Sequence, residues 1–99
     1  MTAYNVVRMR VKPEFLDAFL AHYRERPMDM PGLKSMTLVQ TGERDFCLIG
    51  EWTGVDAIAA ARTRMIANLD AHRGKLEDLG TGLGVTDPVS GEAVVERQA

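Results

Sequence analysis

The sequence predicts an α+β fold, an antiparallel sheet with two helices on one face, and three observations lead to this prediction. Residues 4–12 and 33–41 each alternate between two sets of side chains, as strands do. Residues 13–26 and 54–79 place apolar residues three or four positions apart, as amphipathic helices do. Residues 42–45 form a short turn before a third alternating run, which indicates a hairpin. With a final strand the order becomes β-α-β-β-α-β, the ferredoxin-like arrangement.

The first strand has one apolar face and one charged face. Its residues fall into two sets, Asn5, Val7, Met9 and Val11 on one side and Val6, Arg8, Arg10 and Lys12 on the other. Pro13 suits the first turn of the helix that follows, because that turn needs no N–H donor from it. The helix should extend to about residue 26 before Pro27, Pro31 and Gly32 end it. Its apolar stripe consists of Phe15, Leu16, Phe19, Leu20 and Tyr23.

The third strand leads into the second helix. It presents Phe46, Leu48 and Trp52 on one side and Cys47, Ile49 and Glu51 on the other. Thr53 is expected to cap the start of the helix with its hydroxyl group. The predicted helical stripe runs through Ile58, Ala61, Met65, Leu69, His72, Leu76 and Leu79. His72 is the one titratable side chain on it. Gly74 interrupts this helix, and the alternatives are a kink there or a separate last turn.

The C-terminal part is predicted to contain a connector, a turn and a short strand. Residues 80–84 follow a helix instead of joining a strand to a helix, so they predict a flexible connector and not a phosphate-binding loop. Residues 87–91 are rich in turn formers, and residues 92–96 are predicted to form the last strand. Residues 1–99 are expected to make a single domain.

Composition argues against several classes of protein. The net charge is −2 and the basic residues are scattered, so neither nucleic acid nor an anionic membrane is an expected partner. No apolar run has the length of a membrane span, and the first residues lack the apolar core of a signal peptide. Cys47 is the single cysteine, which fits a cytoplasmic location. Two histidines without a cluster of further ligands predict no metal site.

The charged side of the first strand indicates which face of the sheet the helices cover. Arg8 and Arg10 cannot lie unpaired beneath apolar helix stripes, so they are expected on the opposite, outer face. That face would carry Val6, Arg8, Arg10, Cys47, Ile49 and Glu51. It is too apolar to be left exposed, and two such faces packed together would form a homodimer with Arg8, Arg10, Ile49 and Glu51 in its interface. The alternative is a monomer whose mixed face is solvated.

Three motifs resemble the antibiotic biosynthesis monooxygenase family of dimeric α+β barrels. They are the VVRMRVKPEFLDAF start, the Pro31-Gly32-Leu33 entry to the second strand, and the FCLIGEWTGVDAIAA passage from strand to helix. The resemblance covers roughly residues 4–79. It implies a pocket between the sheet and the helices of one protomer.

The resemblance also implies an activity. Characterised enzymes of the family oxidise polycyclic phenols to quinones with dioxygen and without metal or flavin, so no cofactor is expected. A related branch degrades haem with an asparagine on its first strand and a tryptophan and a histidine on its second helix. Asn5 and His72 lie near two of these positions, but the tryptophan position falls at residues 59–61, which are alanines. The resemblance therefore argues against haem degradation.

The predicted site combines two catalytic candidates with apolar walls. His72 would take a phenolic proton and Asn5 would stabilise the resulting anion. Trp52, Met9, Phe46 and Met65 would bind the substrate, a small aromatic or quinone-like molecule. The plain alternatives are that His72 and Asn5 satisfy nearby backbone groups and that the apolar residues are core. The matching functional alternative is a non-catalytic dimer that binds a small ligand or has a structural role.

Overall fold

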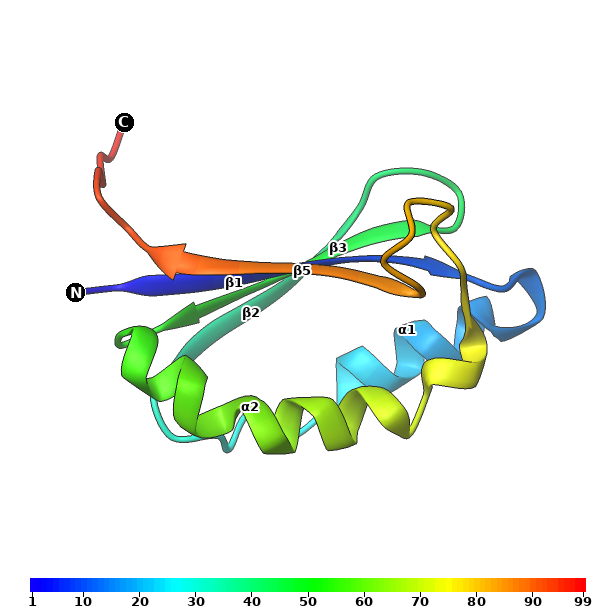
Figure 1. Ribbon diagram of the computed structural model, residues 1–99, viewed down its shortest axis with the longest axis horizontal. Coiled ribbons are helices and arrows are strands. Elements are labelled where there is room, and N and C mark those ends of the chain that lie inside the picture. Colours follow the sequence, from blue (N-terminus) through cyan, green and yellow to red (C-terminus); the bar gives the residue numbers. More distant parts are fainter.

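The computed structural model describes residues 1–99 and has the predicted ferredoxin-like order with a divided last strand (Figure 1). The strands are β1 (Ala3–Val11), β2 (Leu33–Gln40), β3 (Asp45–Trp52), β4 (Leu76–Glu77) and β5 (Thr86–Glu92). The helices are α1 (Leu16–Glu25) and α2 (Val55–Asp70), with short 3-10 turns η1 (Pro13–Phe15) and η2 (Arg73–Lys75). Both α-helices lie on one side of the sheet, as predicted (Figure 1). Neither helix is long and apolar enough to cross a membrane.

Strand β1 lies at the centre of an antiparallel sheet. One edge of β1 pairs with β3, which in turn pairs with β2 in the predicted hairpin. The other edge pairs first with β5, from Ala3 opposite Glu92 to Met9 opposite Thr86. Beyond Met9 the same edge pairs with β4. The fourth strand position is therefore filled by two segments that residues 78–85 separate.

The predicted extension of the second helix to Leu79 is wrong. Helix α2 ends at Asp70, and the turn η2 leads directly into β4. Leu76 has helical spacing from the apolar residues of α2, yet it is buried in the sheet opposite Val11. Pairing with β4 gives hydrogen-bond partners to the backbone of β1 at Arg10 and Val11. A longer α2 would have left this edge of β1 unpaired. The expected cap is also absent, because Gly54 occupies the N-cap position and no side chain bonds there.

The predicted last strand, residues 92–96, is displaced toward the N-terminus. Residues 86–92 form β5, whereas residues 87–91 were expected to turn. Pro88 is tolerated because β5 is an edge strand, where a missing N–H need not cost a ladder hydrogen bond. The free edge of β1 explains the pairing, which local composition did not indicate. The tail after β5 leaves the sheet on the side away from the helices (Figure 1).

The core lies between the helices and the sheet face that the sequence predicted. One buried cluster joins Met9, Val11, Phe19, Phe46, Leu48 and Leu76, and a second joins Ala3, Met30, Trp52, Ile58 and Ala61. The entry to β2 depends on Gly32, whose φ of +83° disfavours a side chain. A Cβ there would also lie 2.5 Å from the Cβ of Ala57.

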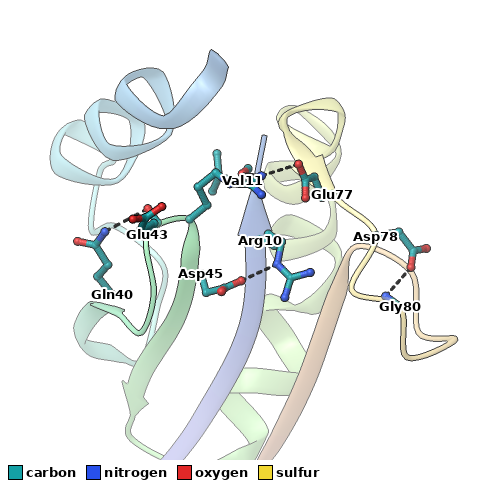
Figure 2. A network of polar contacts seen from close by, with 9 residues as sticks. Arg10, Val11, Gln40, Glu43, Asp45, Glu77, Asp78 and Gly80 are labelled. Carbon is teal, nitrogen blue, oxygen red and sulfur yellow. Dashed lines mark hydrogen bonds and ion pairs between the residues drawn. The ribbon is translucent and has the colours of Figure 1, made fainter. Parts of the chain in front are cut away.

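Polar contacts join β1, β3 and β4 at the end of the sheet where β4 replaces β5 beside β1 (Figure 2). Arg10 donates from Nε to Asp45 on β3 at 2.7 Å. Arg44 donates to the Val11 carbonyl at 3.1 Å and to Glu77 of β4 at 2.5 Å. These partly exposed ion pairs link β1 to β3 and the residue before β3 to β4, and pairs of this kind are expected to add little to the stability of the fold.

Candidate functional site

A cavity of about 420 Å³ lies between the sheet and the helices, on the side that the sequence predicted. Such a volume suits a small organic ligand. Apolar side chains from β1, β3 and α2 form much of its wall, namely Val7, Met9, Leu48, Ile58, Met65, Ile66 and Leu69. Its polar lining consists of Asn5, Tyr23, Arg26, Arg62, Asn68, His72, Thr86 and Ser90. Pro88 and Val89 of β5 complete the wall.

Asn5 is held by a hydrogen bond from the core. The indole Nε1 of Trp52 donates to Asn5 Oδ1 at 2.7 Å, and Trp52 is only 1% exposed. An indole N–H is a donor only, so the partner atom must be the amide oxygen. The amide nitrogen of Asn5 is thereby turned to the other side, where it lies 4.0 Å from the sulfur of Met65. The cavity wall therefore contains an oriented N–H donor.

Gly50 makes this hydrogen bond possible. It lies opposite Asn5 in the pairing of β1 with β3. A Cβ at this position would be 2.3 Å from Asn5 Oδ1 and 2.8 Å from Trp52 Nε1. An added side chain would therefore have to displace both atoms of the hydrogen bond. The three residues thus form one unit, in which the missing side chain of Gly50 provides the space.

His72 is buried on the cavity wall, although α2 ends before it. It is 4% exposed and occupies the N-cap position of η2, not the helical stripe that was predicted. Its Nε2 lies 3.3 Å from the hydroxyl of Tyr23 on α1. Its Nδ1 is buried near the backbone of Asn68 without a well-directed hydrogen bond. The ring of His22 on α1 packs against it, with ring centroids 4.7 Å apart and a tilt of 48° between the ring planes.

The surroundings keep His72 neutral. Burial, followed by repulsion from the neighbouring imidazole of His22 when it is protonated and from the positive charges of Lys75 and Arg26, lowers the pKa of His72 to about 4. The backbone of Asn68 acts weakly in the opposite direction. At neutral pH the imidazole can therefore accept a proton or a hydrogen bond.

Tyr23 and Arg26 are site residues that the sequence analysis missed. Burial raises the pKa of Tyr23, while the positive charge of Arg26 acts to lower it. The guanidinium carbon of Arg26 lies 5.8 Å from the centre of the Tyr23 ring. Tyr23 belongs to the predicted apolar stripe of α1, and Arg26 directly follows the end of that helix, three positions later; this proximity to the stripe is the signal that could have identified them. Arg62 and Asn68 have similar spacings from Met65 on α2.

The structure divides the predicted substrate-binding residues into two groups. Met9 and Met65 line the cavity together with Asn5 and His72. Phe46 does not line it, because its ring packs against Phe19 with centroids 5.1 Å apart. Trp52 also lies behind the wall and contacts the cavity only through Asn5.

The predicted outer face is present on the other side of the sheet. Register places Val6 beside Ile49, and Arg8 beside Cys47. The charged residues have partners within the chain: Arg8 lies 3.6 Å from Asp87, and Glu51 accepts hydrogen bonds from Ser35 and Tyr4 at 3.1 and 3.4 Å. No group of three or more histidine, cysteine or carboxylate side chains in the structure is arranged to hold a metal ion.

Comparison with known proteins gives a family match and several structural matches. The family model described as antibiotic biosynthesis monooxygenase matches residues 2–65. No curated protein matches the chain. A protein of unknown function from Nitrosomonas europaea has a TM-score of 0.72 at 16% identity, covering 99% of this chain and 94% of its own.

Two further solved structures have named activities. SnoaB, a cofactor-independent oxygenase from Streptomyces nogalater, has a TM-score of 0.69 at 18% identity, covering 96% of this chain and 95% of its own. The haem degrader MhuD from Mycobacterium tuberculosis has a TM-score of 0.62 at 19% identity, covering 97% of this chain and 99% of its own. At these identities the likeness extends to the fold alone.

Substitution of Gly50 tests the unit formed with Asn5 and Trp52. We expect Gly50→Ala to break the hydrogen bond and to destabilise the protein by about 1–3 kcal/mol, because buried polar groups lose their partners. Trp52 is the only tryptophan, so a shift of intrinsic fluorescence emission should accompany the loss. Gly74→Ala is the control, since its added Cβ meets nothing within 4 Å. Equal stability and unchanged emission in Gly50→Ala would contradict the proposed constraint.

The low pKa of His72 predicts a loss of stability in mild acid. The ordinary pKa of 6.5 applies to the unfolded chain and about 4 to the folded chain, so the unfolded chain binds the proton first as pH falls below 6.5. Stability should fall by about 2 kcal/mol between pH 7 and pH 5 from this group alone. Urea denaturation of the natural protein and of His72→Gln isolates the contribution. The same pH dependence in both proteins would mean that His72 titrates normally.

Proposed function

Because the chain belongs to the antibiotic biosynthesis monooxygenase family, we propose that it is a cofactor-independent monooxygenase of a small aromatic or quinone-like molecule. The family match supports a monooxygenase-type function. The observation that supports the proposal best is that one apolar cavity has both an oriented N–H donor, on Asn5, and a neutral imidazole, on His72. A flat, apolar substrate suits a wall that includes Met9, Met65 and Leu48.

The proposed reaction begins with removal of a proton from the substrate. The Tyr23 hydroxyl lies 3.3 Å from His72 Nε2 and both residues line the cavity, so in the proposed reaction the hydroxyl passes the substrate proton to the imidazole. The positive charge of Arg26, which helps to keep His72 neutral, also favours a phenolate in the cavity. The Asn5 N–H group donates to the oxygen that gains negative charge.

Dioxygen then reacts with the electron-rich substrate anion. For an anthrone, dioxygen accepts electrons from the carbanion, one oxygen atom becomes the new quinone carbonyl, and the other leaves as water with the two hydrogens that the ring carbon loses. The sum, anthrone plus dioxygen to anthraquinone plus water, balances without another reductant. The protein's role is to bind the ring, remove the proton and exclude bulk water.

A dioxygen-uptake assay of the metal-free protein tests this function. We expect uptake with at least one member of a panel of hydroquinones, anthrones and related phenols. His72→Ala and Asn5→Ala should each lower kcat about 100-fold, because each removes an interaction that forms as the anion develops. Arg24→Gln, an exposed change elsewhere on α1, is the control and should keep full activity.

Two outcomes would contradict the proposed chemistry. Uptake that is unchanged in both variants would remove His72 and Asn5 from the reaction. No uptake across the panel would favour the non-catalytic alternative, a small-ligand-binding protein of the same fold.

We also propose that the chain forms a homodimer through its outer face. Proteins of this family are typically dimeric. Val6 and Ile49 are half-buried in the single chain and would be covered by a second sheet. Arg8, Arg10 and Glu51, which have partners within one chain, would lie at the interface as exchangeable ion-pairing groups.

Charge introduced at the centre of the outer face should separate the dimer. We expect Ile49→Lys to be a monomer in sedimentation velocity at micromolar concentration, because the lysine would be buried without a partner between the two sheets. Val55→Lys adds the same group at a residue of α2 that is 45% exposed, on the opposite side of the sheet, and should leave the dimer intact. A natural protein that sediments as a monomer would contradict the dimer.

A further inference from the structure

The cavity contains positive charge and no negative charge. Two arginines line it, Arg26 just after α1 and Arg62 on α2, and none of the lining residues is aspartate or glutamate. The chain as a whole has more acidic than basic residues, with a net charge of −2. The acidic residues nearest to Arg26 in the chain, Glu25 and Asp29, line a neighbouring hollow and not this cavity.

Neither arginine is neutralised by a carboxylate of the protein. The six ion pairs of the structure use other basic residues. Asp29 borders a neighbouring hollow that Arg26 also lines, but it pairs with Arg64. Arg62 is exposed on α2, and Arg26 is half-buried. Two guanidinium groups are therefore free to bind an anion, for which their planar arrays of N–H donors are well suited.

The other polar groups of the cavity are compatible with an anionic ligand. The Asn5 amide presents its N–H side toward Met65 and the cavity, because its oxygen is occupied by Trp52. His72 is neutral and adds no charge that would need a counterion. Arg26 acts to lower the pKa of both Tyr23 and His72, which indicates that its positive potential extends to the centre of the site.

We propose that the ligand of this cavity is an aromatic carboxylate, whose ring occupies the apolar wall and whose carboxylate binds Arg26 and Arg62. This inference rests on the proposed function for the aromatic part and adds the charged group. Binding through a carboxylate at the arginines would also orient the ring, so that a phenolic oxygen elsewhere on it reaches Asn5 and Tyr23. The arginines are then specificity determinants, since they distinguish charged from neutral aromatics without taking part in proton transfer.

A pair of probes that differ only in charge tests the proposal. The probes are hydroxynaphthoate and the carboxamide of the same isomer, and their binding to the whole protein is measured by fluorescence titration. The natural protein should bind the carboxylate at least about tenfold more tightly than the carboxamide, since hydrogen bonds between charged groups are stronger than neutral ones. Raising the salt concentration should reduce this difference.

Variants assign the difference to the arginines. Arg26→Gln and Arg62→Gln should each weaken carboxylate binding about tenfold and change carboxamide binding less than about twofold. The single variants Arg24→Gln and Arg97→Gln each remove one positive charge from an exposed position outside the cavity and should change neither. Thermal denaturation of each variant verifies that it is folded.

Three results would overturn the inference. They are equal binding of the two probes by the natural protein, an equal loss of both in the arginine variants, and no binding of either probe. In the first case the cavity still takes aromatics, so the proposed oxygenase function would stand. Failure of that function is detected separately, as absent dioxygen uptake by protein that retains carboxylate binding.

Discussion

The hydrogen bond from Trp52 to Asn5 is the constraint on which the rest of the site depends. It joins a core residue to a cavity residue across two neighbouring strands, and it exists because Gly50 leaves space for it. A buried indole N–H without a partner would be costly, so the amide is held in one orientation. Trp52 therefore acts on the cavity without lining it. Its burial gives the Asn5 donor a fixed direction, which a surface asparagine would not have.

The same positive charges affect both the protonation of His72 and the binding of an anion in the cavity. Lys75 and Arg26, which help to keep His72 neutral, also make the same region favourable for an anion. A base with a low pKa is by itself weak, but the proton transfer that it accepts becomes easier when the substrate anion is stabilised as well. The absence of carboxylates from the cavity lining thus has two results: His72 stays neutral, and the arginines have no anionic partner there. Any carboxylate added to the cavity would change both.

The sequence was informative where local pattern and tertiary packing agree. Alternation predicted which residues of β1 and β3 face the helices, and burial of Met9, Phe46 and Trp52 confirms it. The end of α2 and the position of β5 could not be predicted in this way, because pairing with β1 decides both. His72 was identified, although for a helical position that it does not occupy. Its contacts with Tyr23 and His22 come from α1, so no spacing within one element contained them.

Strand β1 contributes to both proposed roles of the sheet, the wall of the cavity and the dimer interface. Asn5 and Met9 face the cavity, whereas Val6 and Arg8 face outward, so a shift of register by one residue would exchange the two sets. Pairing on both edges, with β3 and with β5, fixes this register along most of the strand. A partner sheet packed on Val6 would restrain the same backbone that positions Asn5. Dimer formation would therefore stabilise the geometry of the cavity even though no partner residue needs to enter it.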